Sequence, residues 1–177
     1  MKLYVREVTI NDKKELLEMV DEIKNDIIED KFEGFRDLSN LTSDNFDEFL
    51  IEREHNKTMK LYKPHLVDQT TFLLVDDNNH IYGGGNIRHE LNEDLLLYGG
   101  NIGYLIRPSE RKKGYGTLLL KLLLDECKKF GINKVLVTCR EENIGSAKVI
   151  ENNNGIYENS KYKEEDHETY RRYWINI

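Results

Sequence analysis

The stretch RPSERKKGYGTLLLKLLLDECKKFG, residues 107–131, places three consecutive basic residues and two glycines directly before a leucine-rich segment. Its apolar residues recur at helical spacing, which predicts a helix that ends near Phe130 and is followed by Gly131 as its left-handed C′ residue. The stripe expected to be buried consists of Leu119, Leu120, Leu123, Cys127 and Phe130. A helix that only needs to begin can use a single Ser or Asp as its cap, so this basic glycine turn indicates a further purpose.

The turn has the features of an anion site. The first N–H groups of a helix lack intrahelical partners, and the helix dipole makes that end positive. Gly114 and Gly116 would let a ligand approach the backbone closely, and Lys112 and Lys113 add positive charge. A phosphate group fits this combination best. The alternative is an exposed lysine pair that binds no ligand.

Two common phosphate motifs do not fit the turn. A P-loop requires Lys and then Ser or Thr after its last glycine, and here Gly116 is followed by Thr117. A dinucleotide fingerprint requires a third glycine where Leu119 stands, and it opens the sheet instead of lying two thirds along the chain. The sequence therefore argues against both nucleotide-binding classes.

The elements around the turn predict an α/β sheet. Proline 108 ends a strand that leads into the turn, and the helix is followed by the β-branched strand KVLVTC (134–139) and a second helix. This order requires at least one parallel crossover. The other expected elements are a strand over residues 3–9, a helix from Asn11 or Asp12 to about Ile28, a short helix from Ser43 or Asp44 that shares Phe46, Phe49 and Leu50 on one face, a hairpin over 70–88 with its turn at 76–79, an ambiguous segment at 91–99, and two strands around residues 163–168.

Composition limits the classes of protein. The chain has 177 residues, 38% hydrophobic and 33% charged, which suits one folded domain. A net charge of −7 argues against a general nucleic-acid binder. The cysteines and histidines show no metal-ligand spacing, so no metal is predicted. No apolar run is long enough to span a membrane, and the N-terminal residues alternate, so no membrane partner and a cytoplasmic location are expected.

The six residues RKKGYG (111–116) match the R/Q-x-x-G-x-G/A signature of the GCN5-related N-acetyltransferase (GNAT) superfamily, in which it binds the pyrophosphate of coenzyme A. The resemblance extends over residues 99–157, because the strands and the segment NIGSAKVIENNNG (143–155) follow the family's order, and Asn143 with Ser146 resembles its N-x-x-[AS] segment. The stretches around residues 107–117 and 136–151 resemble a bacterial branch of predicted acetyltransferases.

The resemblance implies a single-domain α/β GNAT fold. Its central sheet would be mixed but mostly antiparallel, flanked by helices and splayed between the fourth and fifth strands, with acetyl-CoA in the opening. Residues 1–177 would form one N-acetyltransferase domain. Residues 1–68 would supply the N-terminal strand and the acceptor-side helices, and residues 69–177 the sheet and the acetyl-CoA-binding half.

The family's roles can be carried over by position. The strand backbone would pair with the pantetheine arm, a bulge would leave the Ile106 N–H free as an oxyanion donor, and the turn would hold the pyrophosphate. The residues expected to bind the cofactor are Tyr104, Leu105, Ile106, Arg111, Lys112, Lys113, Gly114, Tyr115, Gly116, Thr117, Asn143 and Ser146. Asn143 and Ser146 have an alternative explanation as the N-cap and the N3 residue of a helix.

The acid and base of the reaction are less clear. The family's usual tyrosine acid would fall at Ile150, so Tyr157 is the replacement candidate, with strand packing as its alternative role. An alkyl ammonium must lose a proton before it can attack a thioester. The candidates for the base are Glu90, His89, Glu141 and Glu142. Cys139 has the strand parity of a buried residue and is not expected to be a nucleophile.

The expected function is acetyl transfer from acetyl-CoA to a primary amine of a small molecule or peptide. A non-catalytic acetyl-CoA sensor or scaffold is the alternative, and a homodimer is compatible with the sequence. Residues 26–54 carry ten acidic and three basic residues. With Phe32 and Phe35, the carboxylates Glu33 and Asp37 would form a wall for a cationic acceptor, unless the acidic surface only maintains solubility.

Overall fold

The computed structural model describes residues 2–26 and 32–177. Their strands and longer helices are β1 (Leu3–Glu7), α1 (Lys13–Lys24), α2 (Phe46–Asn56), α3 (Met59–Tyr62), β2 (Gln69–Asp76), β3 (Ile81–Arg88), β4 (Ile102–Ile106), α4 (Tyr115–Lys129), β5 (Lys134–Arg140), α5 (Ile144–Glu151), β6 (Ile156–Lys163) and β7 (Glu168–Asn176). Single helical turns are formed by η1 (Ile10–Asp12), η2 (Arg36–Leu38), η3 (Leu95–Gly99, a π turn) and η4 (Pro108–Glu110).

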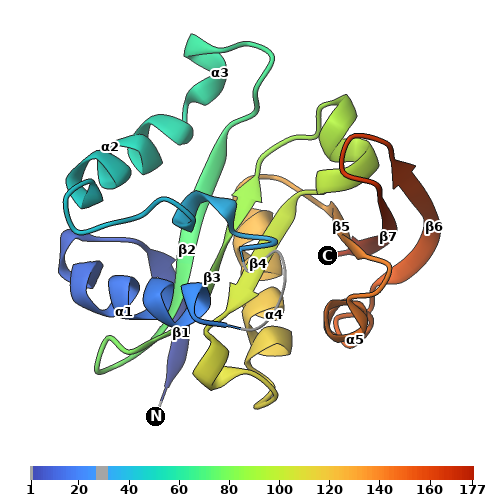
Figure 1. Ribbon diagram of the computed structural model, residues 1–177. Helices are drawn as coiled ribbons and strands as arrows, with labels where there is room; N and C mark the ends of the chain where they lie inside the picture. Colours follow the sequence, from blue (N-terminus) through green and yellow to red (C-terminus); the bar gives the residue numbers. More distant parts are fainter. Residues whose placement is uncertain (1, 27–31) are drawn as a thin grey trace.

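The strands form one mixed sheet (Figure 1). Within the described residues it has seven strands in the order β1-β2-β3-β4-β5-β7-β6. Neighbours pair antiparallel except β4 and β5, which are parallel and are connected through α4. This confirms the predicted α/β class, the mostly antiparallel sheet and the parallel crossover.

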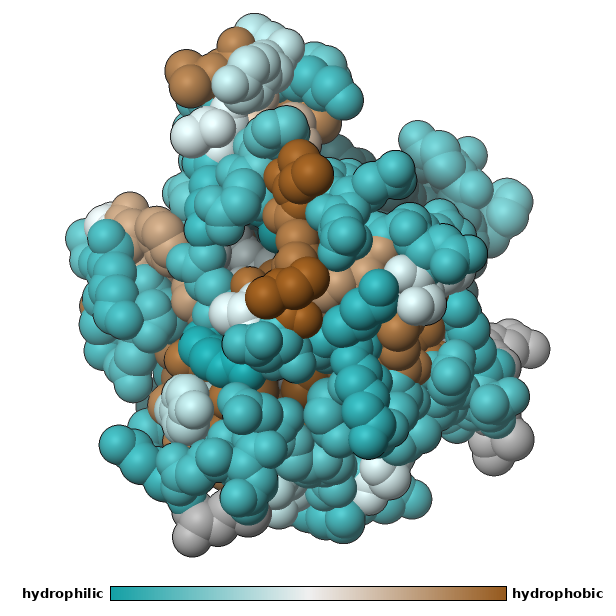
Figure 2. All heavy atoms as spheres, turned by 90° about the vertical axis from the view of Figure 1, so that its left-hand side faces the viewer, coloured by the Kyte–Doolittle hydropathy of each residue, from teal (hydrophilic) through white to brown (hydrophobic). Residues whose placement is uncertain are grey.

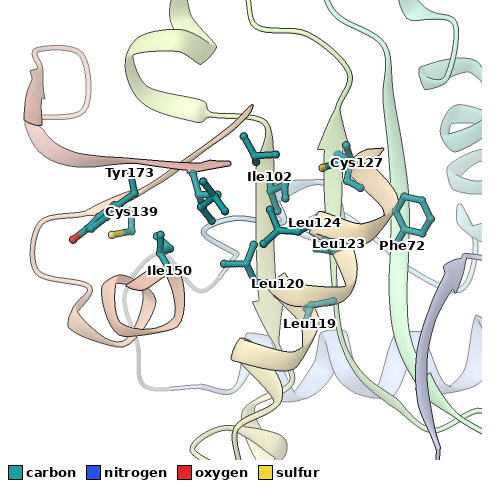
Figure 3. Close-up of a cluster of buried hydrophobic side chains, with 14 of the residues drawn as sticks. Phe72, Ile102, Leu119, Leu120, Leu123, Leu124, Cys127, Cys139, Ile150 and Tyr173 are labelled. Carbon is teal, nitrogen blue, oxygen red and sulfur yellow. The ribbon is translucent and has the colours of Figure 1, made fainter. Parts of the chain in front are cut away.

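Two apolar layers cover the sheet because side chains alternate along each strand. On β2, Leu73 and Val75 point into the cluster that includes α1, α2 and Phe35, while Phe72 and Leu74 point into the cluster beneath α4 and α5. Figure 3 shows part of the second cluster, where residues of α4 meet Ile102 of β4. The opposite face, seen in Figure 2, is mostly hydrophilic with a hydrophobic band in its upper half.

Helix α4 confirms most of what its sequence predicts. Leu119, Leu120, Leu123 and Cys127 are fully buried. Gly131 is left-handed with φ of 74°, and the Ile132 N–H reaches the Cys127 carbonyl, as in a Schellman ending. The prediction for Phe130 is wrong: it is 36% exposed, because its ring stacks on His89 at the sheet edge instead of entering the core.

The N-terminal half differs from expectation at the helix ends. Helix α1 begins at Lys13, after the turn η1, and ends at Lys24 with Asn25 as its C-cap, before the predicted end near Ile28, which itself lies outside the described residues. Helix α2 begins at Phe46, later than predicted, because Asn45 exchanges hydrogen bonds with Thr42. The predicted loop before Asp68 contains helix α3, whose Lys60 N–H is held by the Asp68 carboxylate at 2.8 Å.

Candidate active site

A cleft opens where β4 and β5 diverge. The two strands pair only at Ile102 and Val137. Just before this point, Asn101 joins them: its N–H reaches the Leu136 carbonyl at 2.7 Å and its side-chain oxygen accepts the Leu136 N–H at 2.9 Å. Beyond it the strands separate around a cavity of about 490 Å³. The predicted splay between the fourth and fifth strands is therefore confirmed.

The cleft is lined from several parts of the chain. The walls come from β4, from the end of β5 and from the start of α5, with the segment after Phe32, the turn η3 and the β6–β7 turn at the rim. Among its lining residues are Tyr104, Cys139, Asn143 and Ser146. Arginine, lysine and carboxylate side chains also contribute, so the cavity is polar enough to hold a charged or hydrogen-bonding molecule.

The glycine turn lies where β4 leads into α4. Gly114 is left-handed with φ of 87°, and a Cβ at this position would meet no atom within 4 Å. The first N–H of α4 with an intrahelical partner is that of Leu118, which reaches the Gly114 carbonyl. The N–H groups of Tyr115, Gly116 and Thr117 therefore form the N-terminal end of the helix dipole. Gly114 is exposed, whereas Gly116 is half-buried, and a Cβ there would lie 3.1 Å from Val149 of α5.

The cations of the turn have different roles. Arg111 is held by the protein, because its guanidinium pairs with Asp26 and donates to the Ile106 carbonyl at 3.2 Å. Lys113 pairs with Glu110 at 3.0 Å and is about half exposed. Lys112 is exposed, with φ of 61°, and makes no ion pair within the described part of the chain. Lys112 and Lys113 are thus available at the surface, whereas Arg111 fastens the turn.

The backbone N–H and C=O groups of β4 point alternately toward β3 and away from it. The Arg107 N–H reaches the Tyr82 carbonyl, so in an antiparallel ladder the Leu105 groups also face β3 and those of Ile106 face away. The donation from Arg111 to the Ile106 carbonyl agrees with this direction. Ile106 therefore presents its N–H to the open side, while Leu105 does not, contrary to its predicted pairing with pantetheine.

The predicted bulge in β4 is wrong. The register from Gly83 opposite Ile106 to Ile87 opposite Ile102 has no shift. Ordinary strand alternation is sufficient to turn the Ile106 N–H away from β3.

A loop lies directly against β4. Gly34 is left-handed, with φ of 84°, and a Cβ there would lie 2.3 Å from the Tyr104 carbonyl oxygen. A Cβ at Gly103 would likewise lie 2.5 Å from the Gly34 carbonyl oxygen. The two glycines thus allow a close backbone contact, which covers β4 at Tyr104 and leaves Ile106 further along the strand.

Asn143 and Ser146 face the cleft and are already hydrogen-bonded. Asn143 caps α5 by accepting a hydrogen bond from the Ser146 N–H at 3.0 Å. This confirms the alternative prediction that Asn143 and Ser146 are the N-cap and N3 residues of a helix. The Ser146 hydroxyl bonds the Tyr104 hydroxyl at 2.9 Å. This bond joins β4 to α5 across the opening.

Burial keeps the reactive side chains of the cleft protonated. It raises the pKa of the Tyr104 hydroxyl, and the charge of Glu33 adds to the rise. It also raises the pKa of the Cys139 thiol to about 12, again with a contribution from Glu33. At neutral pH Cys139 is therefore a thiol and a poor nucleophile, in agreement with its predicted role as a buried strand residue.

The family follows from the sequence of this region. The model of the acetyltransferase (GNAT) family matches residues 33–156. The chain belongs to the GNAT family. Its match includes the glycine turn, both walls of the cleft and helix α5. Among proteins of curated function, no significant sequence match was found.

Solved GNAT structures share the fold at low sequence identity. An acetyltransferase of the GNAT family from Streptococcus pneumoniae is 19% identical with a TM-score of 0.63, over 99% of this chain and 100% of that one. RimL, a ribosomal L7/L12 alpha-N-protein acetyltransferase in complex with coenzyme A, is 17% identical with a TM-score of 0.68, over 100% of this chain and 95% of that one. A chimera of spermidine N-acetyltransferase SpeG from Vibrio cholerae and hSSAT is 15% identical with a TM-score of 0.64, over 99% of this chain and 96% of that one.

In this GNAT chain the predicted acid and base lie outside the cleft. Glu90 pairs with Lys60 at 2.5 Å beyond the end of β3. Tyr157 is 54% exposed on β6, with its hydroxyl 3.1 Å from that of Ser160. Figure 3 places Ile150, at the usual position of the acid, beside Cys139 in the core.

The other candidate bases are also removed from the cavity. His89 stacks on Phe130 and bonds the Thr70 hydroxyl at 3.0 Å, and burial lowers its pKa. Glu141 and Glu142 are exposed in the turn after β5. None of these three side chains lines the cavity found among the described residues.

The predicted acceptor wall does not form as expected. Phe35 is fully buried between the sheet and the α1 layer, so its ring offers no face to a ligand. Asp37 is bound by Arg53 at 2.5 Å and by the Asn86 amide at 3.1 Å. Glu33 alone of the two carboxylates lines the cleft.

Sequence reasoning expected Glu33 on the acceptor side but missed two arginines that meet it at the cleft. Arg88 approaches from the end of β3 and Arg140 from the end of β5. Arg88 donates to the carbonyls of Gly99 and Gly100, both at 3.1 Å, and thereby fixes the entry into β4. No short motif joins these positions. The sequence signal nearest to them is Gly34 beside Glu33, since a glycine can adopt the left-handed conformation that a close backbone contact requires.

Within residues 2–26 and 32–177, no group of three or more His, Cys, Asp or Glu side chains is arranged to hold a metal ion. In the same residues no helix has the length and apolar character needed to cross a membrane.

Proposed function

We propose that the protein transfers an acetyl group from acetyl-CoA to a primary amine of a small molecule or peptide. The observation that carries this proposal is the single pairing of Ile102 with Val137, after which β4 and β5 open a cleft. From the cleft β4 leads to the glycine turn of α4, where a Cβ at Gly116 would lie 3.7 Å from Ile106 and 3.1 Å from Val149 of α5. β4 thus connects a slot for an extended arm with a turn that fits a phosphate group, as coenzyme A requires.

The residues of the turn fit a pyrophosphate. The open space at Gly114 and the N–H groups of Tyr115, Gly116 and Thr117 form an anion-binding helix end. Lys112 and Lys113 add charge from the surface, while Arg111 keeps the turn in place through Asp26. We assign phosphate binding to residues 112–117 and a positioning role to Arg111.

The residues of the cleft fit the reacting end of the cofactor. The Ile106 N–H would donate to the thioester oxygen and stabilise the negative charge that develops there. Asn143 and Ser146 would contact the pantetheine arm. Residues 1–68 would cover the acceptor side and residues 69–177 would hold the cofactor. The whole chain would thus act as one N-acetyltransferase domain.

The acceptor is proposed as an amine because of the family and its named relatives. RimL is named for the α-amine of a protein, and the SpeG chimera for spermidine. The cleft supplies hydrogen-bonding and charged side chains of both signs, which suits a polar amine.

The experiment that tests the function is CoA release from acetyl-CoA. The amine panel contains spermidine, Nα-acetyl-lysine, an aminoglycoside and a peptide with an N-terminal serine. Saturable, amine-dependent release supports the transferase. Tight binding of acetyl-CoA without release for any amine would instead favour the sensor or scaffold role.

A further inference from the structure

Glu33 is fixed at the cleft by the residues that follow it. Gly34 packs on the backbone of Tyr104, and the Phe35 side chain is fully buried. An exposed loop side chain would normally sample many positions, but here the two adjacent anchors restrict the backbone of Glu33. Its carboxylate therefore has a defined place next to β4.

The Glu33 carboxylate crosses the opening to the opposite wall. One oxygen accepts from the Asn143 side-chain amide at 3.3 Å, and the other lies 3.6 Å from the Arg140 Nε. Its side chain is 27% exposed, so water can reach it. The carboxylate is thus held between β4, β5 and α5 while it remains in contact with solvent.

The other carboxylates that line the cleft are less suited to meet a reacting group. Asp94 is 63% exposed at the turn before β4 and pairs with Lys163 at 3.5 Å. Asp166, in the β6–β7 turn, accepts from the Tyr170 hydroxyl in an exposed bond of 2.8 Å. Both lie at the rim, whereas Glu33 reaches the two residues of α5 and β5 that border the splay.

Charged and titratable groups from β4, β5 and β7 surround Glu33. Among the described residues, Arg140 on β5 is a cation close to Glu33, and it also pairs with Glu168 of β7 at 3.3 Å. Tyr104 on β4 and Cys139 on β5 stay neutral, since burial and the charge of Glu33 raise the pKa of each. Glu33 can therefore accept a proton without competition from these two groups.

We propose that Glu33 is the general base of the transfer, a role that rests on the proposed function. An amine enters mainly as an ammonium ion, and Glu33 accepts one of its protons. The freed nitrogen lone pair forms the new C–N bond, and the C–S bond of the thioester breaks with its electron pair on the leaving sulfur. The nitrogen's surplus proton and the one on Glu33 then pass to solvent through the exposed part of the cleft.

The test compares Glu33→Gln with Glu90→Gln, which removes the base expected from sequence. CoA release is measured from pH 6.5 to 9 with the serine peptide and with Nα-acetyl-lysine. With either amine, Glu33→Gln should lower kcat/KM about 100-fold at pH 6.5. For the peptide, whose α-amine has a pKa of about 7.7–8.0, the deficit should nearly vanish by pH 9, while for the ε-amine of pKa about 10.4 it should persist. Glu90→Gln should change the rate less than about twofold.

A second readout separates catalysis from binding. The Glu33→Gln side chain keeps its shape and an oxygen for Asn143, so acetyl-CoA should raise the Tm of this variant as much as that of the wild type. A lost Tm shift, a deficit that is equal at every pH and for both amines, or no deficit at all would overturn the base assignment while leaving the transferase intact. Wild-type protein that releases no CoA with the whole amine panel would overturn the proposed function and this role together.

Discussion

The glycine turn at residues 107–117, which follows β4, and the loop at residues 32–38, which borders the cleft, are encoded differently. The turn is built from consecutive residues, and its left-handed Gly114 and following helix are both visible in one short stretch. The loop acquires its place from distant partners: Gly34 meets Tyr104, and Glu33 meets Arg140 and Asn143. The comparison teaches that the proposed cofactor end of this site is specified locally and the proposed acceptor end by tertiary packing.

The largest expected effect concerns the loop. Phe35→Ala should lower the free energy of unfolding by about 3–5 kcal/mol, because it removes a fully buried ring and leaves a cavity beneath the sheet. Denaturant unfolding measures the change. Phe130→Ala is the matched control, since that ring is 36% exposed and should cost less than about 1.5 kcal/mol. Equal losses at the two positions would contradict the claim that the loop depends on this anchor.

A smaller effect is expected at the base of the turn, where Arg107 joins β4 to α1. It pairs with Glu22 at 2.7 Å and with Glu15 at 3.0 Å. Arg107→Met should lower the free energy of unfolding by about 1–3 kcal/mol, less than for fully buried pairs because both carboxylates are about a third exposed.

The same Arg107 substitution should change the pH dependence of stability. Burial alone would raise the pKa of Glu15 and Glu22, but hydrogen bonds outweigh it and lower both pKa values. For Glu15 they come first from the Ile81 N–H and then from Arg107, and for Glu22 first from Ser109 and then from Arg107. A carboxylate whose pKa is lower in the folded than in the unfolded state stabilises the fold fully at pH values above its unfolded pKa. This stabilisation is lost as the pH falls through the folded pKa. The difference between wild type and variant should be constant from pH 6 to 8 and shrink below about pH 4.5. A difference that grows in acid would contradict these pairings.

The smallest effect is expected at Tyr157, outside both regions. Tyr157→Phe should retain at least about a tenth of kcat, a change under about 1.4 kcal/mol in the barrier, because the side chain is half exposed on β6 and does not line the cleft. Steady-state CoA release measures it. A thousandfold loss would mean that β6 moves its tyrosine into the site during turnover.

The local part of the fold was predictable from sequence. Hydrophobic periodicity identified α4 and its buried leucines, Gly131 marked the helix end, and Pro108 marked the end of the strand before the turn. These signals act between residues a few positions apart. Phe130 was misplaced for a related reason: it has the helical spacing of a core residue, but the helix reaches the sheet edge at that point, where His89 covers the ring.

The acceptor side could not be predicted because its contacts join distant positions. Asp37 was expected at a ligand-binding wall, and only the fold reveals that Arg53 and Asn86 bind it. Glu90 follows β3 in sequence and was a reasonable base, but Lys60 of the short helix α3 holds it outside the cleft. Neither α3 nor its contacts gave a periodic signal.

The measurement that tests the central claim most directly is the acetyl-CoA-induced rise in Tm of Gly114→Val and Gly131→Val. Both glycines are left-handed, at opposite ends of α4, and a Cβ at either meets no atom within 4 Å, so each variant bears a similar backbone strain of about 1–2 kcal/mol. At a ligand concentration of 100 Kd, the wild type should gain about 2.7 kcal/mol, or about 5–10 °C in Tm. We expect Gly131→Val to keep this rise and Gly114→Val to lose it, with NADH and ATP giving far smaller rises in the wild type. An equal acetyl-CoA rise in both variants would contradict the assignment of the glycine turn to the cofactor's phosphates.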